Sequence, residues 1–346
     1  MGSSIDINPS TANIALTAQG SEWLWTCFTL FAASAIALLA FAHRRPPGQR
    51  AWHYLGVAAL LITSVAYFNL AANLAWTPIA VEFIRPGSRG RDQIANGAAS
   101  PPTRAIGYGR YVAWALTVPL QLLMLLLATG FALSRVFLTL FFGLLMVVCG
   151  LIGALISTRY KFGMFSFGVA CLFYIWYTLL MPARKSAFRL GEDVGRAYIR
   201  SASFLSLVWL VYPVIWGCSE GGNVITVTSE SIAYGILDLL AQPVWMALHL
   251  YLIEGLDYDR FGFNSGKWSD SVAYPANATG AHGTTTNAGA NAAGRAGPTS
   301  QVQGVHPATT STTSGARPAA ETGPAPGVAG GTEAAHHPQG EFRSTA

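Results

Sequence analysis

Seven apolar stretches, each long enough to cross a bilayer as a helix, most constrain what this chain can fold into. A hydrocarbon core of about 30 Å needs about 20 apolar residues of helix. The chain offers such stretches at residues 21–43, 52–77, 107–128, 133–157, 162–182, 199–218 and 231–253. Only 11% of the residues are charged, against about 25% in a soluble domain. We therefore expect an all-α membrane protein with seven transmembrane helices.

The basic residues indicate how these helices are oriented. With the N-terminus outside, nine of them fall in cytoplasmic loops and six in outer loops, which favours an outer N-terminus and a cytosolic C-terminus. The inner set is Arg44, Arg45, Arg50, Arg135, Arg184, Lys185, Arg189, Arg196 and Arg200, and the outer set is Arg85, Arg89, Arg91, Arg104, Arg159 and Lys161. Such short clusters between apolar stretches are typical of topology signals and not of a nucleic-acid surface.

Three parts follow from this division. Residues 1–20 form a polar extracellular segment, residues 21–256 form the helical membrane domain, and residues 257–346 form a cytoplasmic tail. The tail consists mainly of Ala, Gly, Thr, Pro and Ser, so it cannot bury enough apolar surface to offset its ordering entropy, and we expect it to be disordered. The four cysteines lie singly in apolar stretches without metal-ligand spacing, and we interpret them as buried thiols.

Among the Asp and Glu residues, only Asp238 lies well inside a predicted span. A carboxylate at this depth costs about 2.5–3.5 kcal/mol on insertion scales, so it needs partners. Counting about 1.5 Å per residue from the outer surface places Ala113, Tyr67 and Tyr212 at a similar depth, with Arg110 one turn above. We expect the carboxylate, the guanidinium and the two phenols to meet in one layer.

Aromatic residues form a stripe on the sixth predicted helix. Trp209, Tyr212 and Trp216 are spaced i, i+3 and i+7, and on the third helix Trp114 and Thr117 precede a proline. By periodicity alone, such a stripe is more typical of a packed core or an interfacial belt than of a ligand site.

Three motifs nevertheless resemble those of the microbial rhodopsins, the type-1 opsins. The stretch from Arg110 to Leu120 resembles their RY-x-D-W-x-x-T-x-P-L pattern on helix 3. The stretch 209–216 matches W-x-x-Y-P-x-x-W on helix 6, and 236–243 resembles LD-x-x-A-K on helix 7. The motifs occur in the family's order on the corresponding helices, so the resemblance implies a seven-helix bundle of microbial-rhodopsin type over about residues 21–256.

The resemblance also implies roles for individual residues. Asp238, Arg110, Tyr67 and Tyr212 correspond to the hydrogen-bonded layer on the outer side of the retinal pocket. Trp114 and Trp209 correspond to the two indoles that sandwich the polyene. Trp216 lies close to its ring and Thr117 belongs to the same pocket.

The departures from the family pattern occur at the positions that carry out the family's chemistry. Gln242 stands in place of the lysine that forms the Schiff base, and an amide is not nucleophilic enough to replace it. Ala113 replaces the counterion and proton acceptor, and Met124 replaces the cytoplasmic proton donor. The resemblance therefore implies a vestigial retinal site, no covalent retinal or other cofactor, and no light-driven pumping.

Among the opsins, the missing lysine, the aromatic-rich fifth helix and the Ala/Gly/Thr-rich tail resemble the fungal opsin-related proteins. That branch includes heat-shock-associated proteins of the plasma membrane. The resemblance implies a stress-linked accessory role in membrane or proton homeostasis, with the lipid bilayer and a plasma-membrane proton pump as partners.

Other hypotheses remain open. The chain could be a sensor that binds retinal or another apolar molecule without a covalent bond, or a passive proton or ion conduit, although Leu239 and Leu240 offer no polar lining. A G-protein-coupled receptor fits the helix count but not the motifs of helix 7. An enzyme is the least favoured, because no catalytic pair or metal cluster is visible and His249 fits an interfacial position. Small residues on helix 4 could support an oligomer or pack within the bundle.

Overall fold

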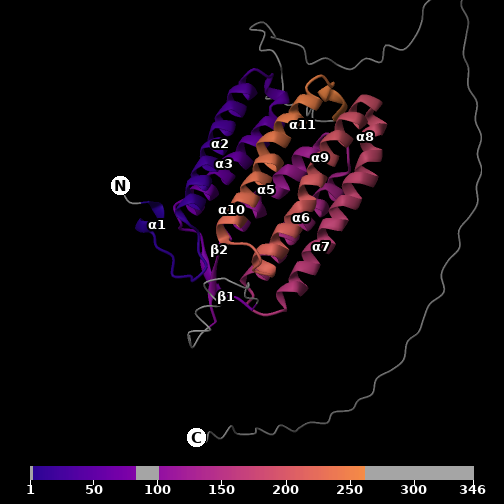
Figure 1. Ribbon diagram of the computed structural model, residues 1–346. Helices are drawn as coiled ribbons and strands as arrows, with labels where there is room; N and C mark the ends of the chain where they lie inside the picture. Colours follow the sequence, from indigo (N-terminus) through magenta and orange to yellow (C-terminus); the bar gives the residue numbers. More distant parts are fainter. Residues whose placement is uncertain (1–2, 83–100, 262–346) are drawn as a thin grey trace, which may run out of the picture. The chain divides into compact units, whose positions relative to one another are not determined.

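The computed structural model describes residues 3–82 and 101–261, and Figure 1 shows these residues as a bundle of long helices. Within them, seven helices are long and apolar enough to cross a membrane, which confirms the predicted number of spans. They cover Ala18–His43, Ala51–Ala71, Tyr108–Leu127, Leu133–Leu155, Lys161–Leu190, Glu192–Gly221 and Val227–Ile253. The predicted tail from residue 262 onward lies outside the described residues.

The elements, in chain order, are α1 (Ser4–Ile7), α2 (Ala18–His43), η1 (Pro47–Gln49), α3 (Ala51–Ala71), β1 (Thr77–Ala80), β2 (Thr103–Ile106), α5 (Tyr108–Leu127), α6 (Leu133–Leu155), α7 (Lys161–Thr178), η2 (Leu179–Ala183), α8 (Arg184–Leu190), α9 (Glu192–Trp216), η3 (Gly217–Gly221), α10 (Val227–Leu239), η4 (Leu240–Val244), α11 (Trp245–Ile253) and η5 (Tyr258–Phe261). Strands β1 and β2 pair antiparallel, with Thr77 opposite Ile106 and Ala80 opposite Thr103. We call the end of the bundle that carries this sheet the sheet end, and the opposite end, which carries α8 and η5, the tail end.

Local sequence explains where several helices begin and where they loosen. Thr17 and Thr226 cap α2 and α10, because each hydroxyl accepts a hydrogen bond from a backbone N–H three residues later. Gly191 separates α8 from α9 with φ +149°, a conformation that side chains with a Cβ rarely adopt. Pro182 and Pro243 each lie in a π-helical turn that interrupts a membrane helix, η2 and η4.

The fifth and sixth spans differ most from the predicted limits. The fifth helix was expected to end at residue 182 and the sixth to begin at 199, but helix continues to Leu190 and resumes at Glu192. Hydropathy marks only the apolar part of a helix, whereas charged residues such as Arg184 and Lys185 extend it beyond the hydrocarbon. The second span, expected to reach residue 77, ends at Ala71 because the chain there turns into β1.

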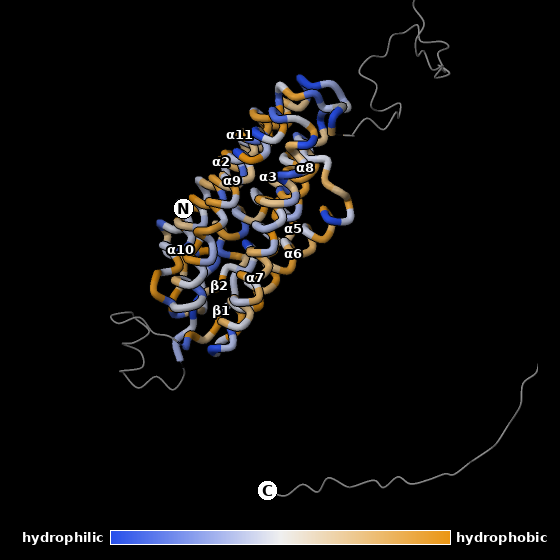
Figure 2. Tube along the Cα trace, turned by 90° about the vertical axis from the view of Figure 1, so that its right-hand side faces the viewer, coloured by the Kyte–Doolittle hydropathy of each residue, from blue (hydrophilic) through white to orange (hydrophobic). Residues whose placement is uncertain are grey.

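The outer surface of the bundle is apolar along its length. Phe137, Phe167, Phe173 and Tyr177 each expose between 61% and 65% of their surface. Figure 2 shows hydrophobic residues along the helices and hydrophilic residues gathered toward the two ends. An apolar surface of this extent fits lipid and would be a liability in water.

The packed part of the chain extends past the predicted boundary at residue 256. The rings of Tyr258 and Phe261 lie edge-on against Trp52, with centroids 5.1 and 5.5 Å apart. Arg260 forms two hydrogen bonds with the carboxylate of Asp193, at 2.8 and 2.6 Å. Two aromatic rings and one arginine within four residues thus give η5 its contacts with the helical bundle.

The cysteines are free thiols. Cys27, Cys149 and Cys171 are buried as expected, whereas Cys218, at the end of the sixth span, is partly exposed.

Candidate functional site

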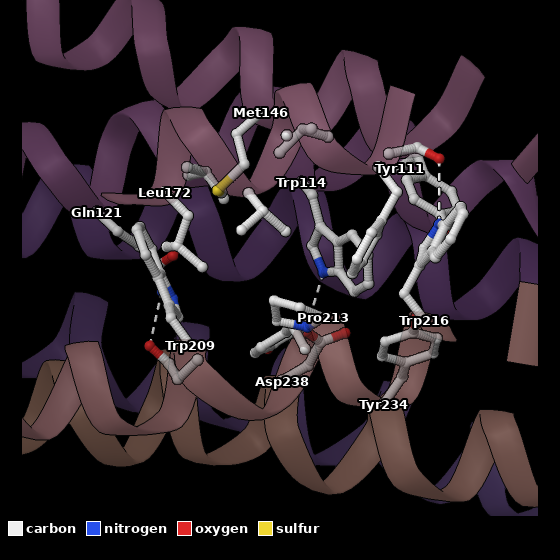
Figure 3. Close-up of a pocket in the computed structure, with 18 of the residues that line it drawn as sticks. Tyr111, Trp114, Gln121, Met146, Leu172, Trp209, Pro213, Trp216, Tyr234 and Asp238 are labelled. Carbon is white, nitrogen blue, oxygen red and sulfur yellow. Dashed lines mark hydrogen bonds between the residues drawn. The ribbon is translucent and has the colours of Figure 1, made fainter. Parts of the chain in front are cut away.

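A cavity of about 110 Å³ lies inside the bundle, between α5, α6, α7, α9 and the α10–η4 segment. Figure 3 shows its lining side chains converging from both walls. The lining consists of Tyr111, Trp114, Val118, Gln121, Met146, Val147, Gly150, Phe165, Gly168, Val169, Leu172, Trp209, Tyr212, Pro213, Trp216, Tyr234, Asp238, Ala241 and Gln242. Most of these side chains are apolar or aromatic, which is typical of a site for a small apolar ligand.

Asp238 is the charged group of the cavity wall, and three donors from three helices bind it. Tyr67 donates to Oδ2 at 2.6 Å, and Tyr212 and Trp114 donate to Oδ1 at 2.7 and 2.9 Å. The predicted contact with the two phenols is therefore confirmed, and the indole of Trp114 adds a third donor that the depth argument did not include. Three hydrogen bonds compensate a carboxylate that exposes only 1% of its surface.

Arg110 does not pair with Asp238, so that part of the predicted layer is wrong. Its Nη1 lies 3.1 Å from Oε1 of Glu230, and its guanidinium lies 4.6 Å from the centre of the Tyr234 ring. Glu230 precedes Asp238 by two helical turns on the same face of its helix, so it offers a carboxylate nearer the level of Arg110. The guanidinium thus lies toward the sheet end of the bundle, where its ion pair is with Glu230.

Glu230 itself is held between two arginines. Besides Arg110, it accepts a hydrogen bond from Nη2 of Arg104 at 2.7 Å, and both members of this second pair expose no more than 2% of their side chains. Arg104 also donates to the side-chain oxygen of Asn223 at 2.6 Å and to the carbonyl of Ile225 at 2.7 Å. Arg104, which lies in strand β2, thereby links this strand to Glu230 and to the chain before α10 at the sheet end.

A third buried carboxylate, Glu220, lies in η3 at the end of the sixth span. Glu220 accepts hydrogen bonds from Tyr111 at 2.7 Å, from Tyr234 at 3.3 Å and from the hydroxyl of Ser219. The ammonium of Lys161, itself buried, donates to the Glu220 carbonyl at 3.0 Å. The sequence had suggested that Asp238 is the only acidic residue well inside a span. Glu220 and Glu230, near the ends of their helices, are buried too.

The aromatic walls of the cavity come from the stripe predicted on the sixth helix and from its neighbours. Trp209, Tyr212 and Trp216 all face the cavity, opposite Trp114. The indole of Trp216 stacks on Phe165 with centroids 4.8 Å apart and donates to a backbone carbonyl of α6 at 3.2 Å. The stripe is therefore part of a cavity wall, which periodicity alone did not indicate.

Gln242 lies in η4, at the tail-end side of Asp238, and its Oε1 accepts a hydrogen bond from Thr63 at 2.7 Å. Beside it, Gln121 donates to the carbonyl of Ala241 at 2.6 Å. None of the described lining residues is a lysine, and Lys161 is engaged at Glu220. The lining therefore offers amides but no amine at this end, and it does not fit a covalently attached aldehyde.

Four of the ten predicted pocket residues do not line the cavity, namely Tyr67, Arg110, Ala113 and Thr117, and neither does Met124, the predicted position of the lost proton donor. Ala113, Thr117 and Met124 expose 5%, 0% and 0% of their surfaces. The hydroxyl of Thr117 has no hydrogen-bond partner among the described residues. It lies one turn from Ala113, where a side chain with an acceptor would reach it.

The described residues contain no group of three metal-ligating side chains. His249, expected at an interface, is fully buried instead and shares a hydrogen bond with Ser201 at 2.9 Å. The chemistry that the described cavity supports is thus the binding of an apolar molecule beside a carboxylate that is already saturated with donors.

Comparisons with known proteins agree with this geometry. The family model described as bacteriorhodopsin-like protein matches residues 19–256. Protein FDD123 of Trametes versicolor is 43% identical over 83% of this chain and 98% of its own length. The opsin-like protein carO of Fusarium fujikuroi is 41% identical over 75% of this chain and 83% of its own.

A more distant relative carries a different name. The 30 kDa heat shock protein of Saccharomyces cerevisiae is 30% identical over 68% of this chain and 73% of its own length. Among solved structures, the light-driven proton pump LR (Mac) of Leptosphaeria maculans is similar with a TM-score of 0.64 and 27% identity, over 70% of this chain and 99% of that one. The chain belongs to the bacteriorhodopsin-like family, a family that normally binds retinal, and its relatives include fungal opsin-related proteins.

Proposed function

We propose that this protein is an opsin scaffold without covalent retinal that acts as a stress-linked accessory protein of the plasma membrane and not as a light-driven pump or an enzyme. The observation that carries the proposal is Gln242. It lies in the cavity wall next to Ala241, at the position where the family motif has its lysine, and its side-chain oxygen is bound to Thr63. An amide cannot condense with an aldehyde to give an imine.

Two further positions support the loss of pumping. Ala113 can neither accept a proton nor balance a cation, and Met124, fully buried, has no proton to donate. Between the cavity and the tail end, Leu125 and Leu126 are also fully buried. This apolar packing argues against a passive proton conduit as well, since conduction requires a polar lining.

The cellular part of the proposal rests on relatives and on charge. A relative is named as a heat shock protein, which supports a role under stress. The inner excess of basic residues favours an outer N-terminus and a cytosolic tail from residue 257. The bilayer and a plasma-membrane proton pump are the partners that we propose, and the ten predicted pocket residues are proposed as a vestigial retinal site.

The direct test is expression of the full chain with all-trans retinal, followed by a visible spectrum and a mass measurement after acid denaturation. We expect no mass increase that corresponds to a retinal adduct. A covalent adduct would overturn the proposal, because it would place a reactive amine in the cavity.

The variant Gln242→Lys tests whether the cavity still accepts the chromophore. We expect this variant to form some pigment but no steady light-driven acidification in vesicles, because Ala113 leaves the cation without its counterion. The double variant Gln242→Lys/Ala113→Asp is the matched control and should absorb at a wavelength different from that of the single variant. Pumping by the single variant would contradict the assigned role of Ala113.

A second candidate function is the non-covalent binding of an apolar ligand. The cavity of about 110 Å³ between Trp114, Trp209 and Trp216 favours it, because well-packed interiors rarely leave such a space. A chromophore that copurifies with the wild-type chain and is released by solvent extraction would support this function. Narrowing the cavity with Gly168→Phe should then abolish retention of the chromophore.

A further inference from the structure

The corner between α8 and α9 at the tail end carries four cations that have no acidic partner in the part of the chain that the structure describes. Arg184, Lys185 and Arg189 on α8 and Arg200 on α9 are exposed, and none of them forms an ion pair with a described residue. The two helices pack against each other, so these side chains belong to one end of one helical pair. We call this set of four the basic corner.

The two acidic residues that follow the turn between α8 and α9, Glu192 and Asp193, are already paired with arginines. The carboxylate of Asp193 binds Arg260 through two hydrogen bonds at 2.8 and 2.6 Å, and Glu192 pairs with Arg196 at 2.5 Å. The guanidinium of Arg260 also donates twice to the Leu190 carbonyl, at 3.1 and 2.8 Å, which holds it over the turn. The corner therefore presents positive charge that its own acids do not cancel.

The basic corner lies next to an exposed apolar face on the helix from Lys161 to Leu190. The helix from Lys161 to Leu190 has 30 residues, or about 45 Å of helix, whereas the hydrocarbon core is about 30 Å thick. Phe173, Tyr177 and Met181 expose 61%, 62% and 55% of their surfaces along it. The cations thus begin where the apolar side chains end, which is the depth of lipid headgroups. Figure 2 shows the same change from hydrophobic to hydrophilic toward the α8 end.

The sequence of residues 262–346 carries no excess of acidic residues that could offset the basic corner. Residues 262–346 contain four Lys or Arg and four Asp or Glu, so the tail has no net charge to balance the corner. A partner must therefore combine an anionic group with apolar chains that lie alongside Tyr177 and Met181. Phospholipids with anionic headgroups have this chemistry, and basic residues next to a membrane helix attract them.

We propose that the basic corner binds the headgroups of anionic phospholipids while their acyl chains lie against the exposed face of α7. The binding depends on neither the vestigial retinal site nor the orientation of the bundle. Each cation is expected to strengthen binding about fivefold, less where salt screens it.

The test uses the full chain in non-ionic detergent, titrated with dioctanoyl phosphatidylserine and, in parallel, with dioctanoyl phosphatidylcholine. Bound lipids are counted by native mass spectrometry. We expect the wild type to prefer the serine lipid, and the variant Arg184→Gln/Lys185→Gln/Arg189→Gln to lose about tenfold or more of that affinity. The matched control, Arg44→Gln/Arg135→Gln/Arg159→Gln, removes the same charge from three separate positions outside the basic corner and should lose less than about threefold.

Several outcomes would overturn the proposal. These are equal affinity for the two lipids, an equal loss in the two triple variants, and equally tight binding of glycerophosphoserine, which has the headgroup without the acyl chains. Tighter binding of a polyglutamate peptide at the same corner would point to an acidic protein partner instead. If the first triple variant fails to fold, Lys185→Gln and Arg189→Gln alone should each lower the affinity about fivefold.

Discussion

The two halves of the bundle differ in the kind of polar side chain that they bury. The half toward the sheet end buries ionic side chains, namely Arg104, Arg110, Lys161, Glu220 and Glu230. In the half toward the tail end, the buried polar side chains described are uncharged groups and histidines, such as Gln121, Ser201 and His249. The same half buries Met124 and the leucines that follow it. Asp238 and Gln242 lie at the boundary between the halves.

This difference follows from where a buried charge can be compensated. A buried charge persists where neighbours from several elements can compensate it, and Glu230 has two such neighbours on β2 and α5. Among the described residues of the tail half, no buried charge has comparable compensation, and Met124 lies at the position that we propose for the lost proton donor. The described residues of the sheet half thus form an ionic network that links several elements, whereas the buried polar side chains described in the tail half are mainly uncharged.

The largest effect is expected at Glu230. The change Glu230→Gln leaves Arg104 and Arg110 buried without a counter-charge, which should lower the free energy of unfolding by about 3–5 kcal/mol. Reversible unfolding by dodecyl sulfate in mixed micelles measures it. The control Arg159→Gln breaks an exposed pair with Glu82 and should cost less than about 1 kcal/mol. Equal losses in the two variants would mean that the sheet half is not held by its buried charges.

A new carboxylate in the tail half should be almost as costly. The change Met124→Asp places a charge among Leu125 and Leu126 with no ion-pair partner described nearby, and should lower stability by about 2.5–3.5 kcal/mol. Met124→Leu keeps the volume and should cost less than about 1.5 kcal/mol. If Met124→Asp is as stable as Met124→Leu, water reaches this half and the contrast between the halves fails.

At the boundary, the expected loss is smaller. The change Asp238→Asn keeps the shape but weakens three hydrogen bonds from Tyr67, Tyr212 and Trp114, so we expect a loss of about 2 kcal/mol. The same unfolding measurement applies, with Glu192→Gln at the surface as the control. A gain in stability would show that the free-energy cost of desolvating the carboxylate exceeds the stabilisation from its three hydrogen bonds.

Much of the fold could be predicted because lipid leaves few alternatives. A backbone that crosses the hydrocarbon must satisfy its own hydrogen bonds, so long apolar stretches are helices whatever their neighbours are. The contact of Asp238 with Tyr67 and Tyr212 followed from depth alone, since three helices enter the membrane at known residues.

The ionic network could not be predicted by the same argument. Arg104 is separated from Glu230 by 126 residues and reaches it from a strand that hydropathy does not mark. A signal was nevertheless present, because Glu230, Tyr234, Asp238 and Gln242 are spaced by four and form one stripe on the last helix. Arg110 was assigned to the wrong carboxylate of that stripe, since a long side chain can reach either of two neighbouring turns.

The smallest predicted effect has the opposite sign and concerns Thr117. Its buried hydroxyl has no partner among the described residues, so Thr117→Val should remove a desolvated polar group and raise stability by about 1 kcal/mol. Unfolding in mixed micelles measures the gain. In the background Ala113→Asp, the new carboxylate one turn away can accept a hydrogen bond from the hydroxyl, and the same change should then be destabilising. A loss in the wild-type background would mean that the hydroxyl is satisfied, by water or by a ligand, and that the polar half of the bundle extends past Asp238 toward the tail end.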